Sequence, residues 1–287
     1  MGVLTEFLAH NFIFQPPNAN SRAAIPKSAN DVFLECAEGN QIHTRLFTAF
    51  DDACTLPDKQ KNESEWDSSK TVVLFSHGNA DDLRCIQSYC TWLAENLNAR
   101  VIAYDPPGYG FSSAVATSEL NMNSAINVVY QYLRVVLNQR SENIVLMGKS
   151  LGSVPTIDLA SRVLEPLQGI ILVSPLASGS RVLLSQKSLA YVPEWLTVQM
   201  DCCFAPSVYK MGAISSPVLF IHGLADHVVS VDNTYALSKA LSPKYLHKPL
   251  FLTQAGHNNM EERYADQFLG TCFDFIWHTC SVVDYEN

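Results

Sequence analysis

The sequence predicts an α/β fold, with a mostly parallel sheet and helices on both of its faces. From residue 71 onward, apolar runs of strand length alternate with segments of helical periodicity. The runs are continuously apolar rather than alternating, which is typical of parallel strands buried on both faces. In addition, a Gly-x-Ser-x-Gly turn follows one of these runs and precedes a helical segment.

The composition limits the kinds of function that the chain can have. Of the 287 residues, 47% are hydrophobic and 16% are charged, which is enough apolar material for a large core. The net charge of −9, without a basic patch, argues against a nucleic-acid partner. The eight cysteines lack the spacing of a metal site, so we interpret them as buried thiols in a reducing compartment. We expect no metal ion and no organic cofactor.

The predicted organisation is an N-terminal segment, residues 1–30, followed by a single α/β domain, residues 31–287. The segment lacks the basic region and cleavage site of a signal peptide. Four of its apolar residues share one helical face: Leu4, Phe7, Leu8 and Phe12. That face would lie either on a membrane or on the domain itself. Gly2 suggests myristoylation, but Glu6 stands where Ser or Thr is preferred.

Taken in order, the elements of the domain begin with a hairpin formed by residues 31–37 and 41–47. Residues 51–70 are polar and aperiodic, so we expect an exposed loop. The apolar runs that predict strands are 71–76, 100–104, 143–147, 169–173, 218–221 and 249–252. The helical positions between the first three runs are Leu83, Ile86, Cys90, Leu93 and Leu97, then Ile126, Val129, Leu133 and Leu137. No apolar run reaches transmembrane length.

Residues 179–211 interrupt this alternation with an apolar segment that carries few charges. We interpret the segment as a small lid-like insertion over the site, which would favour a hydrophobic substrate. An ordinary crossover helix that packs on the sheet is the alternative.

The turn from Gly148 to Gly152 has the residues that an exposed nucleophile needs. A serine between a strand and a helix occupies strained backbone, and side chains at the two glycine positions would clash with the neighbouring elements. Ser150 is therefore the candidate nucleophile. The Leu151 N–H would lie at the start of a helix, where it can stabilise an oxyanion.

A serine hydroxyl needs a base, and the base needs a carboxylate that orients it. Asp226 follows the strand-like run 218–221, and His257 follows the run 249–252. We therefore predict a triad of Ser150, Asp226 and His257, with Asp232 as the reserve candidate for the acid. The second oxyanion donor should come from the loop after the first parallel strand, where the His-Gly pair before Asn79 indicates the Asn79 N–H.

The other titratable candidates have structural interpretations. His77 and His222 each precede a glycine at a strand end, so we expect their rings to hold loop backbone. His227 should point away from its neighbour Asp226. His43 and His247 are predicted on the surface, and Asp158 on a helix face directed away from the turn.

These motifs resemble those of the α/β-hydrolase domain-containing 17 family. The residues that carry the resemblance are 75–80, Phe-Ser-His-Gly-Asn-Ala, together with 105–110, 148–161, 174–182 and 256–258. The resemblance implies an α/β-hydrolase fold and a serine hydrolase that removes palmitate from cytosolic cysteines of membrane-bound proteins. The same triad positions follow from it.

Three features of the chain depart from the family pattern. The family carries an N-terminal cysteine cluster that is palmitoylated, whereas the first cysteine here is Cys36. Lys149 stands where the family has Gln before the nucleophile, and Pro106-Pro107 stands where it has Tyr-Ser.

The resemblance implies S-acylated membrane-bound proteins or acyl lipids as substrates. It also implies a cytoplasmic location, with peripheral contact to the cytosolic face of membranes. Two alternatives stay open at this point. One is a lipase or esterase that acts on monoacylglycerol, lysophospholipid or small esters, and the other is a non-catalytic scaffold with a hydrolase fold.

Overall fold

A computed structural model describes residues 14–17, 30–37, 39–49, 54–56, 66–183, 196 and 205–279. The chain divides into two compact units, Met1–Val145 and Leu146–Asn287. The predicted helical face at residues 4–12 lies outside the described residues, as do most of the predicted 51–70 loop and the centre of the predicted 179–211 insertion.

The first unit contains a four-stranded arrangement in the order β1-β2-β4-β3. The strands β1 and β2 are the predicted hairpin and pair antiparallel, as do β2 and β4, whereas β3 and β4 are parallel. The strands are β1 Asp31–Glu35, β2 Gln41–Phe47, β3 Val72–Ser76 and β4 Arg100–Tyr104. The helices are α2 Gln87–Leu97 and α3 Glu119–Gln131, followed by the π-helical turn η2 Tyr132–Val136 and the 3-10 turn η3 Ser141–Asn143.

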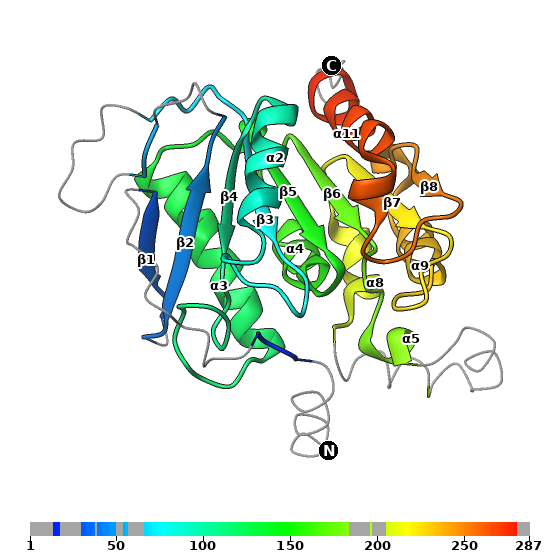
Figure 1. The fold of residues 1–287 in the computed structure, drawn as a ribbon, viewed down its shortest axis with the longest axis horizontal. Helices are drawn as coiled ribbons and strands as arrows, with labels where there is room; N and C mark the ends of the chain where they lie inside the picture. Colours follow the sequence, from blue (N-terminus) through cyan, green and yellow to red (C-terminus); the bar gives the residue numbers. More distant parts are fainter. Residues whose placement is uncertain are drawn as a thin grey trace. The chain divides into compact units, whose positions relative to one another are not determined.

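The two long helices of this unit form where the apolar spacing predicts them. Every predicted apolar position of the two helical segments is buried, including those just outside the helix ends, such as Leu83 and Leu137. Ser118 caps α3, because its hydroxyl accepts a hydrogen bond from the Asn121 N–H at 3.1 Å. Figure 1 shows α2 in front of β4, and α3 on the opposite side, behind β2 and β4. The strands are therefore covered on both faces.

The second unit contains three neighbouring parallel strands, β6, β7 and β8, and most of β5, which begins in the first unit. The strands are β5 Ile144–Lys149, β6 Gly169–Val173, β7 Val218–Gly223 and β8 Leu250–Leu252. The helices are α4 Ser153–Ala160, α5 Gly179–Leu183, α8 Ser207–Lys210, α9 Asp232–Ala240, α10 Met260–Arg263 and α11 Ala265–Asp274. Shorter turns are η4 Ser150–Gly152, η5 Met211–Ala213, η6 Pro243–Tyr245 and the π-helical η7 Phe275–Thr279.

The predicted fold class, α/β with mostly parallel strands, is confirmed. Each predicted strand is present, with boundaries within two residues of the predicted ones. Every residue of β3, β4, β6 and β7 is buried, as expected for parallel strands with continuous apolar runs. Within the described ranges, no helix combines the length and the apolarity needed to cross a bilayer.

One surface prediction is wrong. His43 is almost completely buried on β2, where burial continues without interruption from Ile42 to Phe47. Its ring stacks on Phe33 and meets the ring of Phe111 edge-on, and these aromatic side chains shield it from water. His247, also predicted on the surface, is half-buried with its ring edge against Phe275.

Candidate active site

The serine turn has the strained geometry that the Gly-x-Ser-x-Gly pattern predicts. Ser150 has φ +53°, in the left-handed region that non-glycine residues rarely adopt. The turn is tight, because a Cβ on Gly148 would lie 2.5 Å from Thr156 Oγ1 and 2.7 Å from the Gly152 carbonyl oxygen. Only glycine fits at position 148. The chain then continues as η4 and α4, so the Leu151 N–H belongs to the first turn after the strand.

The loops after β7 and β8 carry Asp226 and His257 and are joined through their backbones. The Leu224 N–H donates to the Leu252 carbonyl and the Ala225 N–H to the Ala255 carbonyl, both at 2.9 Å. A Cβ on Gly223 would come within 2.3 Å of that Ala255 oxygen. This close approach fixes the two loops side by side.

Ser150, His257 and Asp226 form one line of hydrogen bonds. His257 Nδ1 lies 2.7 Å from Asp226 Oδ2, and His257 Nε2 lies 2.9 Å from Ser150 Oγ. A carboxylate only accepts, so Nδ1 carries the proton and the neutral ring leaves Nε2 as an acceptor. The Ser150 hydroxyl then donates to Nε2. This geometry suits proton transfer from the serine to the imidazole.

Asp226 is enclosed by donors on both of its oxygens. Oδ1 accepts from the backbone N–H groups of Val228 and Val229 at 2.9 and 2.8 Å. Burial alone raises the pKa of this carboxyl, but the hydrogen bonds from His222, His257 and Val229 outweigh burial and hold the pKa well below its usual range. Asp226 therefore stays ionised and can stabilise a protonated imidazole.

The sequence interpretation missed Ser174, which acts on the same carboxylate. Ser174 directly follows β6, is fully buried and has φ +44°. Its hydroxyl donates to Asp226 Oδ2 at 3.0 Å, the oxygen that also accepts from His257. A signal was present in the chain, because a polar residue directly after a buried parallel strand lies at the edge where such sites gather.

His222 has the predicted structural role. Its Nε2 lies 2.9 Å from the Val229 carbonyl, to which it must donate, and its Nδ1 lies 2.7 Å from Thr234 Oγ1. The ring therefore holds the loop that follows Asp226, and its Nε2 also lies 3.4 Å from Asp226 Oδ2.

The other titratable candidates of the second unit do not take part in the hydrogen bonds between Ser150, His257 and Asp226. Asp232 begins α9 and accepts from the Ser230 hydroxyl. Asp158, on α4, pairs with Arg162 and Lys210. His227 is exposed next to Asp226.

A second, buried cluster of charged groups holds the His77–Leu83 loop in the first unit. Asp105 directly follows β4, and its Oδ1 accepts from the Leu83 N–H at 2.9 Å and lies 3.3 Å from His77 Nε2. His77 Nδ1 lies 2.9 Å from the Gly78 carbonyl, as the sequence interpretation expects. Asp105 thus contacts both ends of the loop that contains Asn79.

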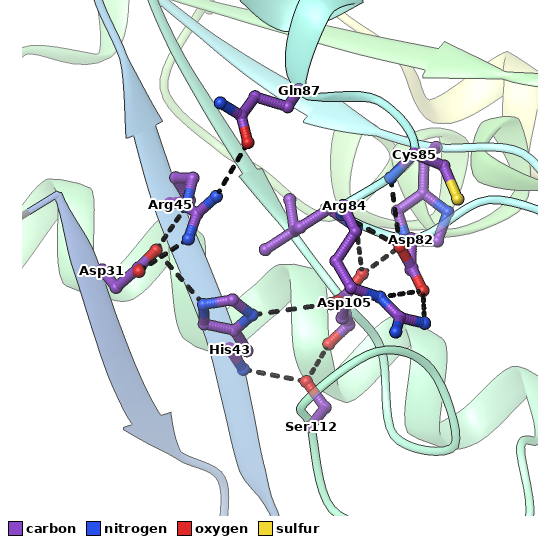
Figure 2. Close-up of polar contacts among 11 residues, drawn as sticks. Asp31, His43, Arg45, Asp82, Arg84, Cys85, Gln87, Asp105 and Ser112 are labelled. Atoms are coloured by element: carbon purple, nitrogen blue, oxygen red, sulfur yellow. Dashed lines mark hydrogen bonds and ion pairs between the residues drawn. The ribbon is translucent and has the colours of Figure 1, made fainter. Parts of the chain in front are cut away.

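The cluster continues as a chain of alternating charge. Figure 2 shows His43 between Asp105 and Asp31, and Arg45 beyond Asp31. His43 Nε2 lies 3.2 Å from Asp31 and its Nδ1 lies 3.6 Å from Asp105. Burial lowers the pKa of His43 and of His77, but the facing carboxylates outweigh it and raise both values. Burial raises the pKa of Asp105, and the two histidines lower it to about 2.

Known proteins resemble this chain in sequence. A model of the serine aminopeptidase S33 family matches residues 67–203. Mouse α/β hydrolase domain-containing protein 17C is 39% identical over 213 residues, which cover 74% of this chain and 61% of that protein. The human 17B protein is 36% identical over 196 residues, which cover 68% of this chain and 62% of that protein. The chain is an α/β hydrolase and a homologue of the domain-containing 17 proteins.

Solved structures agree with this α/β-hydrolase fold. A Pyrococcus furiosus esterase superposes with a TM-score of 0.65 at 16% identity, covering 93% of this chain and 98% of its own. Mouse α/β hydrolase domain-containing protein 10 superposes with a TM-score of 0.57 at 16% identity, covering 86% and 98%. The chain spans about three fifths of the length of the curated domain-containing 17 proteins that it matches.

The two predicted oxyanion donors belong to different units of this α/β hydrolase. Leu151 lies in the second unit, in the turn after Ser150. Asn79 lies in the first unit, where its Oδ1 accepts from the Tyr109 hydroxyl at 2.8 Å and from the Gln15 N–H at 2.9 Å. Their shared role stays a prediction. In the part of the chain that is described, no three or more His, Cys, Asp or Glu side chains are arranged to hold a metal ion.

Proposed function

We propose that this chain is a serine hydrolase that cleaves fatty-acyl thioesters on S-acylated proteins. The observation that carries the proposal is the hydrogen-bonded line from Asp226 through His257 to Ser150. Such a line activates a serine for acyl transfer, because it couples removal of the hydroxyl proton to attack on a carbonyl carbon.

In the first step, Ser150 Oγ attacks the thioester carbonyl and its proton passes to His257 Nε2. The ionised Asp226 stabilises the imidazolium that forms, and the Leu151 N–H is the proposed donor to the oxyanion. The tetrahedral intermediate then breaks its carbon–sulfur bond. The leaving sulfur takes the proton from His257, and the acyl group remains on Ser150 as an ester.

In the second step, a water molecule replaces the departed thiol. His257 Nε2 accepts a proton from the water as its oxygen attacks the acyl-serine carbonyl. Collapse of this second intermediate breaks the ester bond, returns the proton to Ser150 Oγ and releases the fatty acid. The two steps consume one water and need no redox partner.

The substrate class is supported by the resemblance to the domain-containing 17 family, since the triad itself treats thioesters and oxygen esters alike. S-acylated proteins at the cytosolic face of membranes are the proposed partners. An enzyme for such substrates needs only peripheral contact with the bilayer.

A substrate panel tests this function. Release of fatty acid is measured from an S-palmitoylated peptide and from monoacylglycerol, with and without liposomes, using the wild type and Ser150→Ala. We expect hydrolysis of the thioester that depends on Ser150. Hydrolysis of the glyceride alone would assign the chain to the lipases, and a lack of Ser150-dependent hydrolysis of either would favour the non-catalytic scaffold.

A further inference from the structure

We propose that the ion pair between Lys149 and Glu261 is a positioning clamp between two segments of the site. It holds the histidine loop, residues 253–259, against the serine turn, residues 148–152. Lys149 Nζ lies 2.6 Å from Glu261 Oε1. Lys149 is the last residue of β5 and directly precedes Ser150, while Glu261 lies in α10, four residues after His257. The proposal rests on the proposed function, since it assigns these two residues to the alignment of that reaction.

The pair joins two segments that are far apart in the sequence. It spans 112 residues, close to the 107 that separate the Ser150–His257 hydrogen bond in the same unit. One peptide bond connects Lys149 to Ser150, and one turn of chain connects Glu261 to His257. A change in the distance between Lys149 and Glu261 therefore changes the distance between Ser150 and His257.

The histidine loop is rigid enough to transmit this restraint. The Gly256 N–H donates to Asn259 Oδ1 at 2.8 Å, which closes the loop around His257. Met260, the residue before Glu261, is fully buried. Glu261 is thus attached to a fixed helix start, and its bond to Lys149 acts on the loop as a whole.

The surroundings of the pair screen it less than water screens an ordinary surface ion pair. The side chains are 18% exposed for Lys149 and 11% exposed for Glu261, so water screens them weakly. The contact is a charge-assisted hydrogen bond between an ammonium and a carboxylate. Removal of either partner would leave the other charge poorly hydrated, which would displace the segment that carries it.

The clamp differs from the hydrogen bonds that align the acid. The loops of Asp226 and His257 are tied through backbone bonds after β7 and β8, whereas Lys149 and Glu261 tie the same histidine loop toward β5. Neither side chain touches the reacting atoms in the proposed mechanism, so both are positioning residues. Small misplacements of reacting groups cost rate rather than binding.

A double-mutant cycle tests the clamp. The variants are Lys149→Gln, Glu261→Gln, the double neutral variant and the charge swap Lys149→Glu with Glu261→Lys. Each is assayed for kcat and KM on a small acyl ester, and for the rate at which a fluorophosphonate labels Ser150. Arg140→Gln is the matched control, because it breaks an exposed ion pair with Glu142 in the first unit.

We expect each single variant to lower kcat and the labelling rate by about 10-fold, with KM within about 2-fold of the wild type. The double neutral variant should cost much less than the product of the two singles, and the charge swap should restore part of the rate. Arg140→Gln should match the wild type.

Two results would overturn the clamp: single variants that keep wild-type kcat and labelling rate, or losses in the two singles that simply multiply in the double variant. Thermal unfolding of each variant separates a loss of folded protein from a loss of alignment. A wild type that shows no Ser150-dependent hydrolysis contradicts the proposed function instead, so the two failures are distinguishable.

Discussion

At the scale of single residues, Ser150, His257 and Asp226 each make a separate contribution to catalysis that can be measured. Asp226 keeps the proton on His257 Nδ1, and this leaves Nε2 free to accept from Ser150. An amide at position 226 can donate to Nδ1 and so favour the wrong tautomer of the ring.

We therefore expect Asp226→Asn to lower kcat on the order of 10⁴-fold while the protein stays folded. Asp232→Asn is the matched control, since Asp232 contacts Ser230 at the start of α9. Steady-state kinetics on one ester substrate measure both variants. An active Asp226→Asn beside an inactive Asp232→Asn would transfer the acid role to Asp232.

Ser174 gives a second prediction at this scale. Ser174→Ala removes a donor from Asp226 Oδ2, the oxygen that orients His257. We expect kcat/KM to fall by about 10-fold, in line with the loss of one buried hydrogen bond to a charged group. Ser216→Ala also removes a buried hydroxyl, which accepts from the Leu167 N–H, and should leave kcat/KM unchanged in the folded protein. Equal kcat/KM values for the two variants would show that Ser174 does not support the triad.

At the scale of elements, the site depends on close backbone contacts between loops. Gly223 ends β7 against the Ala255 carbonyl, and that contact places the histidine loop beside the aspartate loop. A methyl group there must push backbone aside, because no flexible side-chain end is available to yield.

Gly223→Ala should consequently lower both the melting temperature and kcat. Gly270→Ala is the control, since a Cβ on Gly270 in α11 meets nothing within 4 Å. Alanine is a better helix former than glycine, so this variant should gain about 0.5–1 kcal/mol of stability and keep its activity. Thermal unfolding and an ester assay measure both variants, and a Gly223→Ala protein as stable and active as Gly270→Ala would contradict the close contact.

The charged cluster around Asp105 gives the first unit a pH-dependent stability. The pKa values of His43 and His77 are raised in the folded unit, so their proton binding stabilises it below about pH 6.5 and is lost as pH rises through the folded values. The pKa of Asp105 is lowered to about 2, so its contribution is present above about pH 4 and is lost as pH falls toward 2.

We expect the melting temperature to decline as pH rises from 6 to 9, and this decline to be smaller in His77→Gln. Differential scanning fluorimetry over this range measures both proteins. A wild type whose stability increases from pH 6 to 9 would show that the histidines are neutral in the folded unit.

At the scale of the whole molecule, much of the fold follows from local sequence patterns. Continuous apolar runs predicted the positions of β3 to β8, because parallel strands that are buried on both faces do not alternate apolar and polar residues. The Gly148–Gly152 turn and the loops after two late strands located Ser150, Asp226 and His257. Their positions after predicted parallel strands were sufficient to predict that they lie close together, since the carboxyl ends of parallel strands meet at one edge of the sheet.

Other features depend on tertiary contacts that no local pattern contains. The alternating sequence of β2 suggests an exposed polar face, yet His43 and Arg45 are buried because Asp31 and Asp105 compensate their charges. In the sequence, Ser174 is a polar residue after a strand like many others. Its role depends on Asp226 Oδ2, which lies 3.0 Å from its hydroxyl in the folded chain. The bond between Lys149 and Glu261 spans 112 residues and has no sequence signal.

If His257 activates Ser150 as a nucleophile, covalent labelling of Ser150 depends on His257. Folded wild type and His257→Ala are treated with a fluorophosphonate, and the modified residue is located by mass spectrometry of peptides. We expect a single adduct on Ser150 in the wild type and a labelling rate lower by several orders of magnitude in His257→Ala. Labelling of Ser150 at the same rate in both proteins, or an adduct on another residue, would contradict it.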